Sequence, residues 1–394
     1  MNKPLIVYLD SSDYSVFSDE SKRTPEIVET EEQLIKFIDE DKIEIRFSHI
    51  NVIEAAPIKI EDRLLSVKRL QKIKQFCGYK CLTSYVLLVE NEIEFLRKKK
   101  PSANHSDTLN DNGIWFPSFV DPSEFSYSSD YFKEEISKIP DRKKRRIAER
   151  KFFNKDGSVK NISAFLKGSA ESFAKDICSK YPFTEESAKL AAESYFNNGS
   201  TASFAKLLSN SLSNLDNISK WYEFSWDEAT QLSSFLREIG GDLLSSLELL
   251  KDKSTELTDS YKLEGLIANQ IKNKLNESFD GLLKSLPDTV VNRLNEKHTS
   301  ISNQKVSWEL CPSLLTLTTL SVHLAKLNSL TTRKPKASDF GDILHAAYLP
   351  YVDIFRADGN TASIIEQAKL PFKTKIVSKL TDLPNEINSL LMLR

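Results

Sequence analysis

The chain has few cysteines, few methionines and no long apolar run. It holds four cysteines and two methionines among 394 residues. A disulfide framework is not expected, because the thiols are few and irregularly spaced, at Cys77, Cys81, Cys178 and Cys311. The amino terminus lacks the charged-then-apolar pattern of a signal peptide, and no apolar run approaches the roughly 20 residues that span a bilayer. These absences predict a cytoplasmic protein with no membrane partner.

A strong charge of either sign is also absent. The 54 basic and 56 acidic residues give a formal net charge of -2. Such a balance provides no global attraction to nucleic acid or to an anionic membrane, so any polyanion site has to be a local patch. The length is enough for about two domains, or for one domain with a large insertion.

The first hundred residues alternate strand and helix patterns. Residues 5–9 and 43–47 have the apolar content of buried strands. Thr30 and Gln33 fit a capping box, which predicts that a short helix begins there. After Pro101 the composition turns to Ser and Asn, which favours a boundary at that point.

The rest of the chain divides into a helical part and a return to strands. Residues 101–310 show mainly helical periodicity, and two strand patterns follow at 352–357 and 374–378. Strands near both ends must share one sheet, because a lone pair could not bury its faces. The expected fold is α/β, with a core of residues 1–100 and 311–394 and a mainly α-helical domain inserted at 101–310.

Four acidic residues stand at or near the ends of predicted elements. Asp10 and Asp358 follow strands, whereas Glu54 and Asp342 lie on helices. If the sheet is parallel, the carboxyl ends of its strands share one edge, and the helix acids can lean over it. Converging carboxylates repel one another unless a cation lies among them, and oxygen ligands favour Mg²⁺ or Mn²⁺ over zinc. Such a site can orient a phosphodiester and activate water.

Each acid also has an ordinary structural explanation. Asp10 could begin a turn, Glu54 could lie on a helix surface, and Asp358 precedes a turn-like Gly-Asn pair. Asp339 and Asp342 fit the amino terminus of a helix, where carboxylates bind free N–H groups, and for Asp339 this role is the preferred one. Only the joint placement of the acids favours a site.

Polar neighbours of the acids are candidates for an outer shell around a metal ion. Asn51 lies one helical turn before Glu54, and a histidine one turn after Asp342 could contact a phosphate or orient that acid. Turn, capping and packing roles are equally open for these residues. The candidate set comprises Ser11, Ser12, Asn51, Asp339 and His345.

Two basic segments are candidate nucleic-acid contacts. Positive side chains near aromatic residues can follow a nucleic-acid backbone and stack on unpaired bases, although a solvated helix face is the commoner outcome for a charge run. The denser segment consists of Arg142, Lys143, Lys144, Arg145 and Arg146. The second, with Arg333, Lys334 and Lys336, lies just before the helix that carries Asp342.

Three runs of the sequence carry the acids, at residues 6–12, 48–54 and 339–358. They resemble the acidic motifs of PIN-domain nucleases, in the order of that family. The resemblance covers residues 1–100 and 311–394, and it implies a three-layer α/β/α core with a parallel sheet. It also implies metal-dependent endonuclease action on RNA, with Asp10, Glu54, Asp342 and Asp358 as the metal-site acids. The long helical middle and Ala357 before Asp358 depart from the family pattern.

The leading expectation is therefore an endoribonuclease whose four acids hold one or two Mg²⁺ or Mn²⁺ ions. A DNA substrate, a protein partner or antitoxin, and the oligomeric state are left open. The alternative is a non-catalytic PIN-like module that binds RNA or protein. A phosphatase of the haloacid dehalogenase type would need an acid two residues after Asp10, where Ser12 stands.

Overall fold

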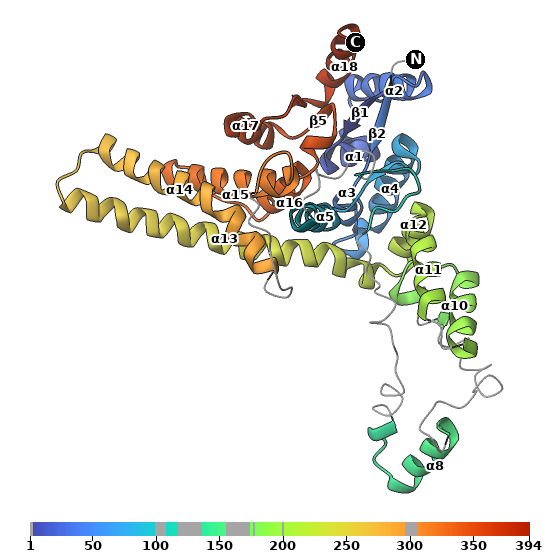
Figure 1. The fold of residues 1–394 in the computed structure, drawn as a ribbon. Helices are drawn as coiled ribbons and strands as arrows, with labels where there is room; N and C mark the ends of the chain where they lie inside the picture. Colours follow the sequence, from blue (N-terminus) through green and yellow to red (C-terminus); the bar gives the residue numbers. More distant parts are fainter. Residues whose placement is uncertain are drawn as a thin grey trace. The chain divides into compact units, whose positions relative to one another are not determined.

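The computed structural model describes residues 3–98, 108–116, 136–154, 174–175, 178–198, 201–295 and 306–394. The chain divides into two compact units (Figure 1). One comprises residues 1–117 and 229–394, and the other residues 118–228. These limits differ from the expected segments 1–100, 101–310 and 311–394, which stay a prediction.

The first unit contains a four-stranded parallel sheet. Its strands lie in the order β2 (Ile43–Arg46), β1 (Leu5–Tyr8), β5 (Ile354–Arg356) and β6 (Lys375–Val377). Pairing of β1 with β5 places Tyr8 opposite Phe355 and so joins the two distant parts of the unit. The parallel sheet with its helical connections confirms the expected α/β class.

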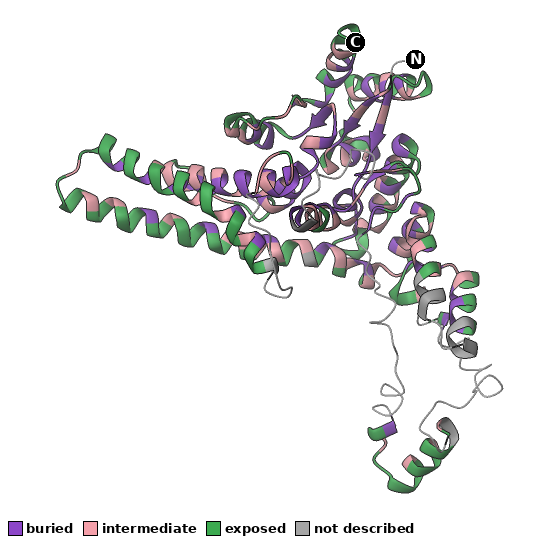
Figure 2. Ribbon diagram, in the orientation of Figure 1, coloured by how far each residue is buried: buried purple, intermediate pink, exposed green. Residues whose placement is uncertain are grey.

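Both faces of the central strands are covered. Val7 and Tyr8 are neighbours in β1, so they point to opposite faces of the sheet, and both are fully buried. In Figure 2 the strands of the sheet are coloured mostly as buried. A parallel strand buried on both faces has a continuous apolar sequence rather than an alternating one. This explains why residues 5–9 are apolar without interruption.

One helix start within residues 11–98 differs from the expected one. The helix start expected at Thr30 is wrong, because α2 begins at Pro25 and Thr24 caps it by accepting a hydrogen bond from the N–H of Ile27. A threonine cap followed by proline in the first turn is a stronger start signal. The elements are α1 (Ser11–Ser18), α2 (Pro25–Asp39), α3 (His49–Glu54), α4 (Arg63–Cys77) and α5 (Tyr85–Lys98), with the antiparallel pair β3 (Cys81–Leu82) and β4 (Leu109–Asn110).

The later helices of this unit share its hydrophobic core. Leu247 from α13 and Phe279 from α14 belong to the same buried cluster as Tyr8 and Phe355, and α14 packs along α15 (Figure 1). The elements are α13 (Trp226–Leu263), α14 (Ala268–Asn295), α15 (Pro312–Leu330), α16 (Asp339–Ala346), α17 (Gly359–Ala368) and α18 (Leu383–Met392). Short 3-10 turns lie at Glu20–Lys22, Ile60–Asp62, Leu349–Tyr351 and Leu380–Asp382.

A buried acid fixes the start of α15. Glu92 on α5 accepts hydrogen bonds from the backbone N–H groups of Ser313 and Leu314, at 2.7 and 2.9 Å, and from the hydroxyl of Tyr351 at 2.9 Å. Burial raises the pKa of Glu92, and these donors oppose the rise. A side chain from another helix thus does what a local cap usually does.

The second unit is helical in its described part. It contains α8 (Arg142–Phe152), α10 (Glu185–Asn198), α11 (Thr201–Leu212) and α12 (Leu215–Phe224). The hairpin of α10 and α11 buries small residues, with Ala188, Ala191 and Ala192 fully buried against Phe183 and Leu208.

Two findings concern the features that the sequence lacks. All four cysteines are free thiols. Within the described ranges, no helix has both the length and the apolar character that crossing a membrane requires.

Two neighbouring glycines of α13 provide a test of this packing. A Cβ atom at Gly240 would lie 2.5 Å from the backbone oxygen of Ala337, in the segment before α16, whereas one at Gly241 would meet no atom within 4 Å. We expect Gly240→Ala to lower the free energy of unfolding by about 1–3 kcal/mol through overpacking. Gly241→Ala should raise it by about 0.5–1 kcal/mol through helix propensity. Urea unfolding measures both, and equal effects would contradict the close approach of α13 to this segment.

Candidate active site

The strand order makes β1 and β5 the point at which the sheet changes direction. The chain moves outward from β1 to β2 on one side and from β5 to β6 on the other. In open parallel sheets, ligands bind beyond the carboxyl ends of the strands at such a point. Asp10 lies two residues beyond β1 and Asp358 two residues beyond β5. Both predicted acids therefore stand where a ligand is expected.

Each of these two acids also caps a helix. The Asp10 carboxylate accepts a hydrogen bond of 2.7 Å from the N–H of Ser12, at the start of α1. Asp358 accepts one of 2.6 Å from the N–H of Thr361, at the start of α17. A carboxylate oxygen has two lone pairs, so a capping bond leaves acceptor capacity for other ligands. Both residues therefore have a capping role, and this role still allows them to bind another ligand.

Asp342 on α16 is the acid without a partner. In the described part of the chain its carboxylate accepts no hydrogen bond and forms no ion pair. Burial raises the pKa of Asp342 to about 7, and the charges of Asp10, Asp358 and, to a smaller extent, Glu54 add to the rise. Charges are weakly screened in a buried environment, so the charges of the other three predicted acids act on Asp342.

Glu54, the last residue of α3, is paired with a histidine of α16. Its Oε2 lies 3.0 Å from Nε2 of His345, which is almost fully buried. Burial lowers the pKa of His345, but the charges of Glu54, Asp10 and Asp342 and the hydrogen bond to Glu54 together raise it above its usual value. Burial likewise raises the pKa of Glu54, but the charge of His345 and the hydrogen bonds to His345 and Ser11 together lower it below its usual value. The ionised pair is therefore the favoured form.

A glycine makes room for Glu54. A Cβ atom at position 341 would lie 2.5 Å from Oε1 of Glu54. Gly341 directly precedes Asp342 on α16, so the missing side chain lets the α3 carboxylate approach the turn of α16 that carries Asp342.

A buried hydrogen-bond network holds His345 from behind. The hydroxyl of Tyr8 in β1 lies 2.5 Å from Nδ1 of His345 and 2.7 Å from the hydroxyl of Ser48. With Nε2 facing the Glu54 carboxylate, this ring is fixed at both nitrogens. These hydrogen bonds join strand β1 to helices α3 and α16.

The predicted outer-shell residues fall into this network or beside it. Asn51 is buried and donates to the carbonyl of Leu9 and to the Ser11 hydroxyl, both at 3.2 Å. Ser11 also contacts Nε2 of His345 at 3.2 Å. Ser12 is exposed, and its N–H supplies the capping bond to Asp10. These residues make hydrogen bonds within the fold, next to the predicted acids.

Asp339 and Arg333 bind each other. The Arg333 guanidinium donates to both carboxylate oxygens of Asp339, at 2.7 and 3.0 Å, and to Asn328 at 2.7 Å. The N–H of Lys336 also donates to Asp339. Asp339 therefore has the structural role that the sequence favours, and Arg333 is engaged within the fold. Lys334 and Lys336 are exposed.

Sequence reasoning missed a second ion pair beside the site. Asp13 on α1 is buried, and its Oδ1 lies 2.9 Å from Nη2 of Arg356, the last residue of β5. Burial raises the pKa of Asp13 to about 7, against the attraction of Arg356. The signals were present in the sequence: Asp10 and Asp13 have capping-box spacing, and Arg356 is a charge in an otherwise apolar strand.

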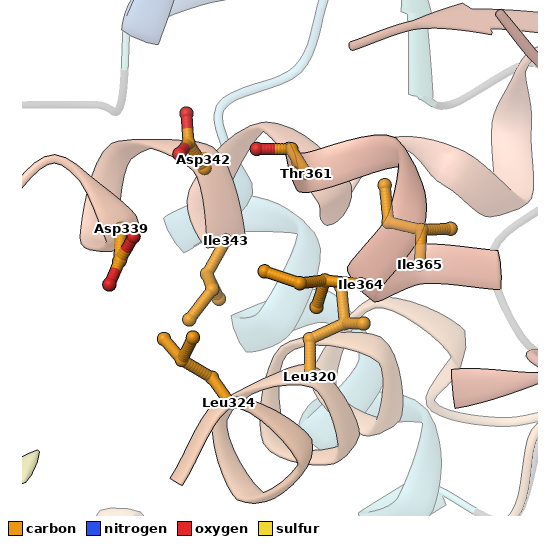
Figure 3. A pocket seen from close by; sticks show the side chains of 8 residues that line it. All are labelled: Leu320, Leu324, Asp339, Asp342, Ile343, Thr361, Ile364 and Ile365. Carbon is orange, nitrogen blue, oxygen red and sulfur yellow. The ribbon is translucent and has the colours of Figure 1, made fainter. Parts of the chain in front are cut away.

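An apolar recess borders Asp342 (Figure 3). It has a volume of about 260 Å³ including the space open to solvent, and it lies between α15, α16 and α17. Leu and Ile side chains converge in it, while the carboxylates of Asp339 and Asp342 lie at its margin. The lining residues are Leu320, Leu324, Asp339, Asp342, Ile343, Thr361, Ile364 and Ile365.

The donor set fits a hard divalent cation in its chemistry. Carboxylate oxygens predominate, and Asp342 lacks a compensating partner. Among the residues with described positions, however, no three His, Cys, Asp or Glu side chains are close enough to hold one ion together. A shared ion would therefore require the acids to come closer than they are here.

No family model, no curated protein and no solved structure matches this chain.

Two aspartates of α16 offer a matched test of this electrostatic arrangement. A carboxyl with a raised pKa keeps its proton in the folded state between about pH 4 and pH 7, where the unfolded chain has lost it, so its contribution to stability falls across that interval. We expect Asp342→Asn to raise the free energy of unfolding at pH 8, in the presence of EDTA, by about 2 kcal/mol.

Asp339→Asn is the control for this change. It breaks a buried pair with Arg333 and should lower the free energy of unfolding by about 2 kcal/mol or more. Thermal or urea unfolding of the two variants at pH 5 and pH 8 measures both effects. A loss of stability in Asp342→Asn at pH 8 would show that this carboxylate is not under electrostatic stress.

Proposed function

We propose that the chain is a metal-dependent endonuclease that acts on RNA and has a PIN-like three-layer core. The observation that supports this most is the raised pKa of the buried, unpaired Asp342 carboxylate, to which the charges of Asp10, Asp358 and Glu54 contribute. The four acids come from separate elements, and Asp10 and Asp358 follow the two strands at which the sheet changes direction. Acids in these positions also carry the resemblance to PIN-domain nucleases.

The proposed chemistry needs charge neutralisation at this place. A bound Mg²⁺ or Mn²⁺ ion would supply a Lewis acid and lower the pKa of a bound water molecule. The four acids would hold it, with Asp342 as the residue that gains most. Tyr8 and His345 hold Glu54 in position, and Asn51 fixes the start of α3. The chain thus provides orientation, and the ion provides the reactive charge.

A basic helix of the second unit supports a nucleic-acid substrate. Asp141 caps α8 by accepting from the N–H groups of Lys143 and Lys144, at 2.7 and 3.0 Å. Four cationic side chains on this helix are exposed and pair with no acid of the described ranges, namely those of Arg142, Lys143, Lys144 and Arg146. The guanidinium of Arg145 is bound to the carbonyl of Ile139. Unpaired cations at this density attract a phosphate backbone.

A second candidate function is a non-catalytic module that binds RNA or a protein. The Glu54–His345 ion pair favours it, because one of the four acids already has a cationic partner. The two functions differ in their response to divalent ions. An ion bound by the folded state raises the melting temperature, whereas a module without an ion site shows no such rise.

Removal of one site charge tests the nuclease. We expect wild-type protein to cleave single-stranded RNA in Mn²⁺ and to melt at a higher temperature with Mn²⁺ than with EDTA. Asp10→Asn should abolish both effects, because it removes a ligand charge while an amide oxygen can still cap α1. Gel-resolved cleavage and thermal melting measure the two outcomes.

The control is Asp19→Asn at the other end of α1. Asp19 caps the following 3-10 turn by accepting from the N–H of Ser21, so the change is chemically the same but distant from the strand ends. It should keep both the cleavage and the Mn²⁺ effect. Undiminished Mn²⁺-dependent cleavage by Asp10→Asn would show that Asp10 is not a metal ligand of the nuclease. A wild-type protein with neither effect would favour the non-catalytic module.

Salt dependence tests the role of α8. We expect Lys143→Gln/Lys144→Gln to weaken binding of single-stranded RNA and to lower the slope of log Kd against log salt concentration by about 1, since each phosphate contact contributes about 0.7. The control is Lys272→Gln/Lys284→Gln, which removes the same charge from exposed positions of α14. Titrations at several salt concentrations, repeated with DNA of the same sequence, measure the effect. Equal slopes in the two variants would show that only net charge matters.

A further inference from the structure

Arg356 is a buried cation at the carboxyl end of β5. It is the last residue of the strand, two residues before Asp358, and is only 8% exposed. An arginine buried to this extent normally has its N–H groups paired with acceptors. Its position is the edge of the sheet at which a ligand is expected.

The guanidinium of Arg356 is only partly paired. Its Nη2 lies 2.9 Å from Oδ1 of Asp13. Nε and Nη1 are shielded from solvent and have no hydrogen-bond partner in the described part of the chain. A guanidinium presents five N–H groups in a rigid fork that matches carboxylate and phosphate oxygens. Buried donors without acceptors are rare, and they call for an explanation by a ligand or by water.

Asp13 can satisfy only part of this fork. Its Oδ1, which faces Nη2 of Arg356, is buried and accepts no hydrogen bond in the described part of the chain. Its second oxygen, Oδ2, accepts the backbone N–H of Asp10 at 3.1 Å as part of the capping box of α1. One oxygen is therefore committed to the helix start, and only the other faces Arg356. A two-pronged pair of the kind that Arg333 forms with Asp339 is not available here.

The charges near Arg356 bear on which ligand its free N–H groups would bind. The four site acids repel a phosphate group, so binding one requires a fixed positive charge at the same edge of the sheet. His345 is committed to Glu54, whereas Arg356 still has free donors. The amino termini of α1 and α17 begin directly after β1 and β5, and their partial positive charge adds to the attraction.

We propose that Arg356 is a phosphate-binding residue of this site, held by Asp13 in the free protein and engaged by a phosphodiester oxygen when nucleic acid binds. The inference rests on the proposed function for the identity of its ligand, a backbone phosphate of RNA. Free inorganic phosphate shares that chemistry and serves as the simpler probe. Binding through Arg356 needs no metal ion, so it can be measured apart from cleavage.

The first experiment measures the melting temperature with inorganic phosphate in the presence of EDTA. We expect phosphate to stabilise the wild type, Arg356→Gln to weaken the apparent phosphate affinity roughly 10-fold or more, and Arg356→Lys to retain part of it. Asp13→Asn should strengthen phosphate binding, because it removes the competing charge while its amide oxygen can still accept the Asp10 N–H. Arg333→Gln is the control, since it breaks another buried Arg–Asp pair and should leave the phosphate response unchanged.

The double variant Asp13→Asn/Arg356→Gln separates binding from a structural role. It removes both partners, so no buried charge is left unpaired and the fold is retained. If Arg356 binds phosphate, the double variant still lacks the phosphate response. If Arg356 only neutralises Asp13, then the wild type and this variant respond to phosphate alike, and the inference is overturned.

A short single-stranded RNA in EDTA provides the second arm. Arg356→Gln should raise its Kd, and under cleavage conditions it should raise KM more than it lowers kcat. A wild type that binds phosphate through Arg356 but never cleaves RNA refutes the proposed nuclease and leaves this inference standing. A wild type that cleaves RNA with Kd and KM unaffected by Arg356→Gln refutes the inference alone.

Discussion

Burial of a carboxylate beside other acids is the electrostatic constraint that the first unit has to accommodate. Asp10 and Asp358 are each compensated by the start of a helix, and Glu54 is compensated by His345. Asp342 has no such compensation, and its pKa rises to about 7 chiefly because of burial and the neighbouring acids. The unfavourable energy of the cluster is therefore concentrated at one carboxylate. A cation that reaches this residue relieves more repulsion than it would elsewhere in the cluster.

The structure withstands this repulsion because the support behind it is rigid. Tyr8 is fully buried, and its hydroxyl links His345 to Ser48 and so joins β1, α16 and α3. The ring of Tyr8 also stacks on Phe355 of the neighbouring strand, with 5.3 Å between ring centroids. A buried polar network of this kind holds its members in one arrangement only if its groups are paired. The unpaired donors of Arg356 stand out against that background.

The sequence predicts where the strands of the core lie better than it predicts which residues and helices contact them. Apolar runs and following acids were sufficient to place Asp10 and Asp358, because strand burial and strand ends leave local patterns. Asp13 and Arg356 each leave a local signal, but no local pattern shows that two such distant charges pair with each other. Helical periodicity reveals an apolar face but not what covers it, so the sequence could not show that Leu247 of α13 packs in the core of β1. The metal ligands and the substrate stay predictions.

The pairing of β1 with β5 also has a consequence for synthesis on the ribosome. Strand β1 is synthesised more than three hundred residues before its neighbour at Ile354–Arg356. At typical elongation rates of about 5–20 residues per second, the interval is roughly 20–70 s. During that time Asp10 and Glu54 have been synthesised, but Asp358 has not. A nascent chain that has not yet reached β5 therefore lacks the strand pairing that places Asp10 and Asp358 at one edge of the sheet.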